Sequence, residues 1–500
     1  MTDPARITHV IGGKAWGAPA ERRGPVFESA TGALVAEVDF AGGREVDVVV
    51  TAARQAFGEW GRSSIATRTK VLFAFRELLA SRATELARIV ATEHGKVVSD
   101  AAGEVARGLE VTEFACGIGS LLRGGFSSHV SRGVDVHSVR QPLGVVAGIT
   151  PFNFPVMVPL WMVPIAIACG NTFVLKPSEK DPSASVALAE LWREAGLPDG
   201  VFNVVHGDAE AVDALLEHPG IRAVSFVGST PVARHVFNTA SATGKRVQAL
   251  GGAKNHMVVL PDADLDAAAD AAVSAGFGSA GERCMAISVV VVVDPVGDEL
   301  VDRIRTRTTA VVMGPSLDAA SEMGPLITAE HRDRVAAYLD AGPAEGATLV
   351  VDGRTHPHAG DAGGYFLGPS VLDYVTPHME VYRDEIFGPV LCVVRVPTTE
   401  SAIALVNANP YGNGTAVFTA DGGAARRFEE EIEVGMVGVN VPIPVPAALY
   451  PFGGWKDSLF GDLHIYGEDG VRFYTRNKVI TSRWPDPSQR GVDLGFPRSH

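Results

Sequence analysis

Residues 277–286 read Phe-Gly-Ser-Ala-Gly-Glu-Arg-Cys-Met-Ala, so that Cys284 stands among small residues. Small neighbours allow backbone and ligand to approach a sulfur atom closely. Arg283 precedes the cysteine, and a cation beside a thiol favours the nucleophilic thiolate. The apolar run at 287–293 predicts a buried strand directly afterwards. Cys284 is therefore a candidate nucleophile, against the alternative of a packed core cysteine, because free cysteine is among the most buried residue types.

An amide side chain, Asn153, lies in a stiff loop that follows a predicted strand at 145–149. Two prolines and two phenylalanines surround it in the sequence Pro-Phe-Asn-Phe-Pro at 151–155. A fixed N–H donor of this kind suits an oxyanion that develops during attack on an aldehyde. A lone asparagine in a loop is more often a turn former, so the expectation depends on its pairing with Cys284.

Two further segments place polar groups where strands end. Lys176 and Glu179 follow a predicted strand at 172–175, and ligands of open α/β sheets bind at the carboxyl ends of strands. A carboxylate there can accept hydrogen bonds from ribose hydroxyls, although a surface Lys–Glu pair is the alternative. Ser229 lies where a strand runs through a glycine into a helix start, a place that suits a pyrophosphate. The chain has no G-x-G-x-x-G fingerprint, so this nucleotide signal is weak.

The length and the pattern of elements predict the fold class. Five hundred residues exceed one ordinary core. Strands alternate with helices from about 144 to 250 and again from 255, which predicts an α/β fold with mostly parallel sheets. We expect a discontinuous first domain, a second domain that carries Cys284, and an arm with a tail, at 1–122 with 141–250, 251–445, and 123–140 with 446–500, respectively.

Helical periodicity at the N-terminal side and strand-like alternation outside the two α/β units complete the expected elements. The unpaired N–H and C=O groups of an exposed strand edge can pair with a strand of another chain. The alternating segments therefore predict self-assembly into a homo-oligomer, either a dimer or a tetramer. The expected helices are 46–60, 65–94 and 100–122, and the expected outlying strands are 133–140, 471–475 and 478–482.

Composition excludes several classes of protein. The net charge of −15 argues against a nucleic-acid surface, which needs a basic patch. Four widely spaced cysteines fit no disulfide framework or zinc pattern, which favours a reducing, cytoplasmic location. The N-terminus lacks the apolar core of a signal peptide. The longest apolar run, 154–169, is shorter than the roughly 20 residues of a spanning helix, so we expect a buried core segment and no membrane association.

A pair of histidines, His356 and His358, is the one pattern that could suggest a metal. The pair lies in a loop rich in glycine and aspartate, without further ligands nearby in the sequence. Such a pair is more often solvent-exposed, and we expect no metal.

The four segments that contain Asn153, Lys176, Ser229 and Cys284, together with 384–390, resemble segments of the aldehyde dehydrogenase superfamily. The similarity runs from about Ile7 to Trp484. The sequence of residues 281–286 is most similar to that of the CoA-acylating methylmalonate-semialdehyde dehydrogenase branch. The resemblance implies two Rossmann-like domains, of which the first binds NAD and the second carries the catalytic cysteine. It also implies a β-strand oligomerisation arm. In this family Cys284 is the nucleophile, and Asn153 shares the oxyanion with the backbone N–H of the cysteine.

The resemblance assigns the cofactor contacts as well. Lys176 and Glu179 contact the adenosine ribose of NAD, whereas Glu385 holds the nicotinamide ribose and Phe387 packs near the ring. Ala233 stands where the superfamily usually has a glycine after the turn at Ser229, so the match there is partial. The full implied cofactor set is Phe152, Lys176, Glu179, Ser229, Glu385 and Phe387.

One departure from the superfamily concerns the fate of the acyl-enzyme. Hydrolytic members carry a glutamate directly before Leu-Gly-Gly, and this chain has Ala249 there. A methyl group cannot act as the base that activates water. The resemblance therefore implies CoA as the co-substrate, with malonate or methylmalonate semialdehyde converted to acetyl-CoA or propionyl-CoA and loss of the carboxylate. A hydrolytic aldehyde dehydrogenase is the first alternative, and a non-catalytic, crystallin-like scaffold is the second.

Two arginines complete the implied site. Arginine is suited to bidentate contact with a carboxylate. In the semialdehyde branch the arginines at the positions of Arg107 and Arg283 hold the carboxylate of the substrate. For Arg107 an ion pair on the helix surface, with Glu104 or Glu110, is the alternative interpretation.

Overall fold

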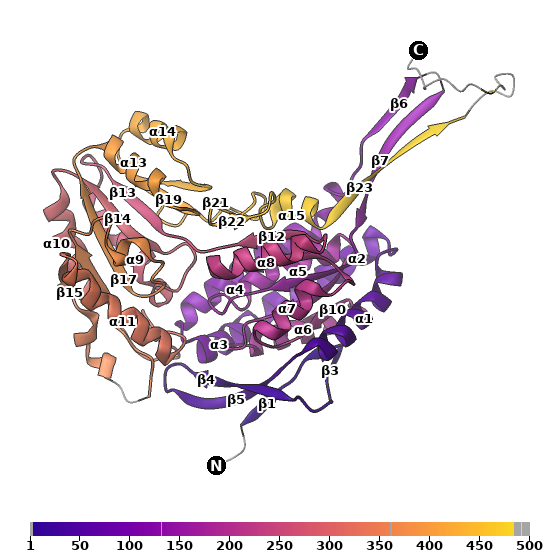
Figure 1. Ribbon diagram of the computed structural model, residues 1–500, viewed down its shortest axis with the longest axis horizontal. Helices are drawn as coiled ribbons and strands as arrows, with labels where there is room; N and C mark the ends of the chain where they lie inside the picture. Colours follow the sequence, from indigo (N-terminus) through magenta and orange to yellow (C-terminus); the bar gives the residue numbers. More distant parts are fainter. Residues whose placement is uncertain (1–3, 132, 361–362, 485–491, 493–500) are drawn as a thin grey trace.

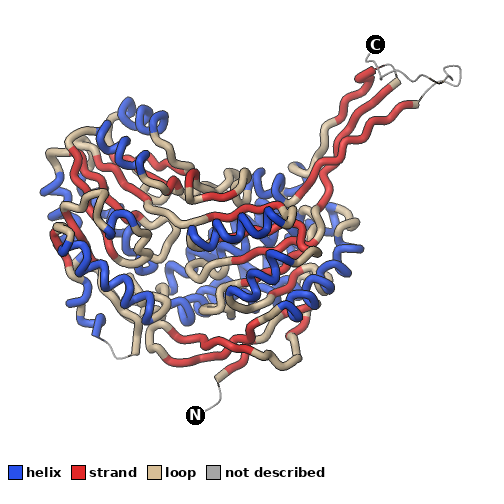
Figure 2. The backbone as a smooth tube through the Cα atoms, in the orientation of Figure 1, coloured by secondary structure: helices blue, strands red, loops and turns tan. Residues whose placement is uncertain are grey.

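Two large β-sheets with helices packed against them form the body of the molecule, and a three-stranded arm projects from it (Figure 1). The computed structural model describes residues 4–131, 133–360, 363–484 and 492. Parts of the expected N-terminal segment and tail, at 1–3, 485–491 and 493–500, lie outside the described residues. The predicted α/β class is confirmed, with helices and strands mixed along the chain (Figure 2).

The first sheet has eight strands in the order β22-β12-β11-β8-β9-β10-β2-β3. Its central strands are parallel, and β8 and β9 are buried along their whole length, as continuous apolar runs in parallel sheets are. The strands are β2 (Val10–Ile11), β3 (Lys14–Ala15), β8 (Val145–Ile149), β9 (Thr172–Lys176), β10 (Phe202–Val204), β11 (Ile221–Val227), β12 (Arg246–Leu250) and β22 (Leu459–Phe460). The accompanying helices are α1 (Gly43–Trp60), α5 (Met157–Ala168), α6 (Ser183–Glu194), α7 (Ala209–Glu217) and α8 (Thr230–Ala242).

Three further helices lie at the N-terminal side of this sheet: α2 (Ile65–Ser81), α3 (Ala83–His94) and α4 (Val98–Cys116). The single helix expected over 65–94 is two helices, because Arg82 leaves the helical conformation with φ −107° and ψ 14°. The helix expected over 100–122 ends at Cys116 before Gly117, and a short 3-10 turn, η1 (Ile118–Ser120), follows it. Neither break carries a proline signal in the sequence.

The second sheet has seven strands in the order β15-β16-β17-β14-β13-β19-β20. Asp264 caps the first helix of this unit by accepting hydrogen bonds from the N–H groups of Asp266 and Ala267, as the acidic first turn predicts. The strands are β13 (Asn255–Val259), β14 (Ile287–Val293), β15 (Thr348–Val351), β16 (Ser370–Asp373), β17 (Val390–Val396), β19 (Gly414–Phe418) and β20 (Met436–Val439). The helices are α9 (Leu265–Phe277), α10 (Gly297–Thr308), α11 (Ala329–Ala344), α12 (Glu380–Arg383), α13 (Thr399–Ala408) and α14 (Gly422–Glu431), with the 3-10 turns η2 (Gly278–Gly281), η3 (Gly353–Thr355) and η4 (Pro357–Gly360).

The arm joins two distant parts of the chain. Strands β6 (Phe126–Ser131), β7 (Val134–Pro142) and β23 (Thr475–Arg483) form an antiparallel sheet, in which β23 runs beside the whole of β7. The prediction of a strand at 471–475 is wrong, because α15 (Gly467–Phe473) occupies most of this segment. The helix buries Val471 and Phe473 in the hydrophobic core beside the first sheet. Smaller sheets pair β1 (Ala5–Ile7) and β4 (Arg22–Glu28) with β5 (Ala33–Phe40), and β18 (Tyr411–Gly412) with β21 (Trp455–Lys456).

The apolar run at 154–169 forms α5, in which every residue is buried. Its hydrophobic side chains pack against the first sheet and α4. In the described ranges, no helix is both long and apolar enough to cross a membrane.

Candidate active site

Cys284 lies between η2 and β14 and is half-buried. Two asparagine side chains hold its backbone: Nδ2 of Asn255 donates to the Cys284 carbonyl at 2.9 Å, and Nδ2 of Asn413 donates to it at 3.1 Å. Asn255 also donates to the carbonyl of Ala286 at 2.9 Å. The cysteine segment is thus tied to β13 and to the loop before β19, and sequence reasoning missed both asparagines.

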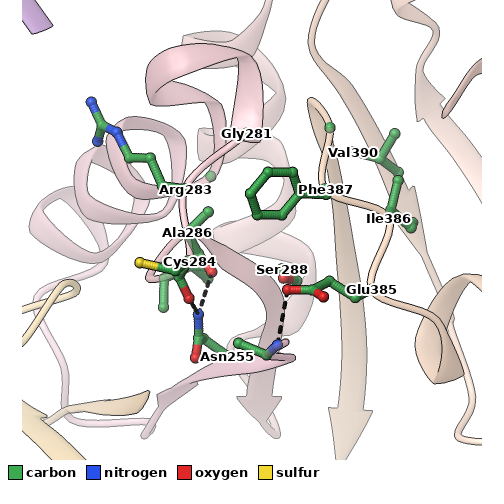
Figure 3. A pocket seen from close by; sticks show the side chains of 14 residues that line it. Asn255, Gly281, Arg283, Cys284, Ala286, Ser288, Glu385, Ile386, Phe387 and Val390 are labelled. Atoms are coloured by element: carbon green, nitrogen blue, oxygen red, sulfur yellow. Dashed lines mark hydrogen bonds between the residues drawn. The ribbon is translucent and has the colours of Figure 1, made fainter. Parts of the chain in front are cut away.

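A small cavity of about 10 Å³ opens beside Cys284. Glu385 and Phe387 line it from the side opposite the cysteine, and Arg283 also contributes to its wall (Figure 3). The structure therefore brings the predicted nucleophile together with two of the predicted cofactor residues. In the same view the Arg283 side chain extends away from the Cys284 sulfur.

Burial raises the pKa of the Cys284 thiol to about 12, and the nearby Glu385 carboxylate raises that pKa further. Backbone N–H groups oppose this effect, and Arg283 opposes it least. The Arg283 guanidinium instead donates to the Asp100 carboxylate at 2.7 Å. Arg283 therefore lowers the pKa of the thiol, as expected, but it has the smallest effect, because its charge is compensated by an aspartate 183 residues away in the chain.

The Asn153 loop rests on a buried ion pair. Nζ of Lys96 donates to Oε2 of Glu104 at 2.8 Å and to the backbone carbonyl of Asn153 at 2.6 Å. Oε1 of Glu104 accepts hydrogen bonds from the N–H groups of Val156 and Met157 at 2.7 and 3.0 Å. Asn153 itself is 3% exposed. The loop is therefore fixed by a lysine and a glutamate as well as by its prolines, and the oxyanion role of Asn153 stays a prediction.

Glu385 is held at the far wall of the cavity. Its Oε1 accepts a hydrogen bond from the N–H of Ala253 at 2.8 Å, and burial raises the pKa of its carboxyl to about 7. Gly252 leaves the space that this carboxylate needs, because a Cβ there would lie 2.2 Å from Oε2 of Glu385. The glycine pair of the Leu-Gly-Gly segment thus has a structural reason.

Phe152 and Phe387 meet although 235 residues separate them in the printed sequence, with ring centroids 5.9 Å apart in an edge-to-face arrangement. Phe387 has φ 57°, and its carbonyl accepts a hydrogen bond from Nε2 of His331 at 2.7 Å. His331 was missed by sequence reasoning, because no local pattern marks it. Of the two aromatic residues, Phe387 lines the cavity, and Phe152 contacts the Phe387 ring.

The remaining predicted cofactor residues lie where strands of the first sheet end. Lys176 is the last residue of β9, and its Nζ lies 3.3 Å from Oε2 of Glu179. Ser229 precedes α8 directly after β11 and has an extended conformation, so the first N–H groups of the helix are available to an anion. These placements agree with ligand binding at the carboxyl edge of a parallel sheet.

Arg107 is engaged in two ways. Its Nη1 donates to Glu110 at 2.6 Å, and its Nη2 donates to the carbonyl of Pro446 at 2.8 Å. The surface ion pair considered from the sequence is present with Glu110, whereas Glu104 binds Lys96. One third of the Arg107 side chain remains exposed, at 34%, and Arg107 does not line the cavity beside Cys284.

Ala249 is the penultimate residue of β12 and is fully buried, within an apolar cluster that also contains Phe226 and Val247. No carboxylate occupies this position. Within the described residues, no three His, Cys, Asp or Glu side chains are grouped as a metal site requires.

Comparisons with known proteins agree on one family. Residues 16–480 match the sequence pattern of the aldehyde dehydrogenase family. A malonate-semialdehyde dehydrogenase of Pseudomonas aeruginosa is 54% identical over 493 residues, which cover 98% of this chain and 99% of that protein.

Solved structures give the same result. A methylmalonate-semialdehyde dehydrogenase of Oceanimonas doudoroffii is similar with a TM-score of 0.95 and 52% identity, covering 97% of this chain and 99% of that chain. A Sinorhizobium meliloti protein, crystallised in complex with NAD, has a TM-score of 0.96 and 49% identity, covering 98% of this chain and 100% of that chain. The chain therefore belongs to the aldehyde dehydrogenase family.

Proposed function

We propose that this protein is an NAD-dependent dehydrogenase that oxidises malonate or methylmalonate semialdehyde and transfers the acyl group to coenzyme A. One observation carries the proposal: the half-buried Cys284 shares a cavity with Glu385 and Phe387, while Ala249 replaces the base that hydrolysis needs. Two semialdehyde dehydrogenases share 54% and 52% sequence identity with this chain, which supports the substrate class.

The reaction begins when the Cys284 thiol gives its proton to solvent and the resulting thiolate sulfur bonds to the aldehyde carbon, so that the carbonyl oxygen becomes an oxyanion. Asn153, on a loop that Lys96 and Glu104 fix, supplies the N–H donor for that oxyanion. Bound NAD supplies the acceptor for the hydride that leaves the former aldehyde carbon. The acyl group then remains on Cys284 as a thioester, the β-carboxylate leaves as CO2, and a proton from water takes its place on the α-carbon.

The residues around the cavity fit NAD. Glu385 presents a carboxylate that can accept hydrogen bonds from ribose hydroxyls, and Phe387, whose ring Phe152 contacts, lines the same cavity for the nicotinamide. Glu179 presents a second acceptor at the end of β9, beside Lys176. The start of α8 at Ser229 offers N–H groups to the pyrophosphate.

The acceptor of the acyl group is CoA in this proposal. General-base assistance to attacking water contributes about 10²–10⁴-fold, and an alanine methyl group at position 249 cannot supply it. A thiol is intrinsically more nucleophilic than water and needs less assistance. The hydrolytic alternative would require another base in reach of the thioester.

The free cysteines and the projecting arm support proposals for the compartment and the oligomeric state of the enzyme. All four cysteines are free, which fits a reducing cytoplasmic compartment. The projecting arm supports assembly into a homo-oligomer through strands β6, β7 and β23.

A substrate panel tests the proposal. NADH formation is measured with malonate semialdehyde, methylmalonate semialdehyde and propanal, each with and without CoA. We expect both semialdehydes to be preferred and the organic product to be an acyl-CoA. Cys284→Ala should abolish NADH formation, and substantial remaining turnover would refute the assigned nucleophile.

A further inference from the structure

Lys254 is a buried lysine that the proposed chemistry does not use. It directly precedes β13, and only 3% of it is exposed. Lysine side chains are almost never fully buried unless they are paired, so a lysine in this position needs a physical reason. In the described part of the chain, the hydrogen-bond acceptors of its ammonium are backbone carbonyls rather than carboxylates.

Both acceptors lie in the segment that leads to Glu385. Nζ of Lys254 donates to the carbonyl of Val381 at 2.8 Å and to the carbonyl of Asp384 at 2.6 Å. Val381 belongs to α12, and Asp384 follows the end of this helix. The ammonium therefore joins a short helix to the peptide bond between Asp384 and Glu385.

The residue before Lys254 holds the other end of Glu385. The N–H of Ala253 donates to Oε1 of Glu385 at 2.8 Å. Two consecutive residues thus hold Glu385, because Ala253 binds its carboxylate and Lys254 binds the carbonyl just before its backbone nitrogen. A side chain that is fixed at both ends loses little conformational freedom when it binds a ligand.

Two further contacts fix the same segment. Nε2 of His256, two residues after Lys254, lies 3.0 Å from the hydroxyl of Tyr382 on α12. The hydroxyl of Tyr338 on α11 donates to the carboxylate of Asp384 at 2.9 Å. The start of β13 therefore holds α12 through two of its side chains, and α11 supports the segment from another side.

The charge of Lys254 favours the form of Glu385 that binds hydroxyls. Burial raises the pKa of the Glu385 carboxyl to about 7, and the N–H of Ala253 opposes this effect, followed by the ammonium of Lys254. An ionised carboxylate has only acceptor oxygens, and two ribose hydroxyls need two acceptors.

We infer that Lys254 is a positioning residue: by binding the carbonyl of Asp384, it fixes the place at which the Glu385 carboxylate meets the nicotinamide ribose of NAD. The inference rests on the proposed cofactor role of Glu385. Lys254 does not line the cavity beside Cys284, whereas Glu385 does, so the effect of Lys254 on NAD passes through Glu385.

Calorimetric titration with NAD and steady-state kinetics with malonate semialdehyde and CoA test this role. Lys254→Met removes the N–H donors and should raise the Kd and the KM for NAD by about tenfold, while the KM for malonate semialdehyde stays within about twofold of wild type. Lys254→Gln keeps an N–H donor on a shorter, neutral side chain and should raise the KM for NAD by only about threefold.

A double-mutant cycle shows whether Lys254 acts through Glu385. Glu385→Gln alone should weaken NAD binding by about tenfold or more. The variant that carries both Lys254→Met and Glu385→Gln should bind NAD within about twofold of Glu385→Gln alone, because the positioned carboxylate is already lost. Losses that add would show that Lys254 acts independently of Glu385, and would overturn the inference.

Lys245→Met is the matched control. Lys245 is also a buried lysine, at 7% exposure, but it precedes β12 at the opposite edge of the first sheet from Lys176, and its Nζ donates to the Thr243 hydroxyl at 2.8 Å. This variant should lower the thermal stability without changing the KM for NAD.

The remaining outcomes separate the inference from the proposed function. Unchanged NAD affinity in Lys254→Met would overturn the inference, and an unchanged KM for NAD in Lys254→Gln would do the same if the methionine variant does not fold. If only the Lys254 variants bind NAD normally, the cofactor role of Glu385 stands. If Glu385→Gln itself binds NAD as tightly as wild type, that role and the inference both fail.

Discussion

The ammonium of Lys96 lies 2.8 Å from the carboxylate of Glu104, and both side chains are fully buried. This ion pair connects the end of α3 to α4 and, through the carbonyl of Asn153, to the loop that carries the predicted oxyanion donor. A buried charge that loses its partner is strongly destabilising. The pair thus couples the stability of the fold to the geometry of the active site.

Glu104→Gln should lower the free energy of unfolding by about 3–5 kcal/mol, because Lys96 then keeps a buried, uncompensated charge. Urea denaturation measures the loss. Glu113→Gln on the same helix is the matched control, since this glutamate forms an exposed pair with Arg76 and should cost less than about 1 kcal/mol. Equal losses in the two variants would contradict the account.

The pKa of Cys284 predicts how the free enzyme reacts with iodoacetamide. Burial raises that pKa to about 12, so the thiol is protonated near neutral pH and the thiolate fraction grows with pH. The alkylation rate at Cys284 should therefore increase about tenfold per pH unit between about pH 7 and 10. Cys284→Ala gives the background, because the other three cysteines are buried. A plateau below about pH 9 would show a thiol of ordinary pKa.

Glu179 should determine the preference for NAD over NADP. Its carboxylate can bind the ribose hydroxyls and repels a 2′-phosphate, so Glu179→Gln should narrow the ratio of kcat/KM values for the two cofactors by about tenfold. Glu190→Gln, on the exposed side of α6, is the control and should leave the ratio unchanged. A wild-type enzyme that uses NADP equally well would refute the assignment.

The arm should mediate self-assembly. Val479 on β23 is 66% exposed, so Val479→Asp would place a charge in the expected subunit contact. Sedimentation should show a dimer or a dimer of dimers for the wild type and a smaller species for the variant. Phe73→Asp on α2, which is 57% exposed, should not change the assembly. A wild-type protein that sediments only as a monomer at micromolar concentration would count against this role of the arm.

The sequence predicts the periodic elements well, because their signals are local. Strand β14 matches the apolar run at 287–293, and α9 begins after the aspartate that the acidic turn indicates. The apolar residues Val471 and Phe473 alternate with polar ones, and this alternation predicts the strand at 471–475 that the structure does not have. In the structure a short helix buries these two side chains against the hydrophobic core beside the first sheet. This helix depends on tertiary packing, which the local sequence pattern does not show.

The site residues divide in the same way. Cys284, Asn153 and Glu385 stand in recognisable segments, whereas their supports come from distant parts of the chain. Asp100 pairs with Arg283 across 183 residues, and Asn413 reaches Cys284 across 129 residues. No local pattern indicates such contacts, so the sequence predicts the effect of Arg283 on the thiol but not the ion pair with Asp100 that weakens it.

Ala249 leads to the central claim, that CoA and not water resolves the acyl-enzyme. Because the methyl group of Ala249 is fully buried, an introduced glutamate would have to fit into an apolar cluster, so the wild-type enzyme gives the cleaner test. General-base help to water contributes about 10²–10⁴-fold, and its absence should leave the thioester long-lived.

The most direct measurement is rapid-mixing NADH formation with malonate semialdehyde and NAD, in the absence and presence of CoA. Without CoA, the account predicts a burst of about one NADH per active site, followed by slow turnover. Addition of CoA should restore steady turnover and yield acetyl-CoA. Equally fast steady turnover without CoA, with release of the free acid alone, would contradict the account and favour the hydrolytic alternative.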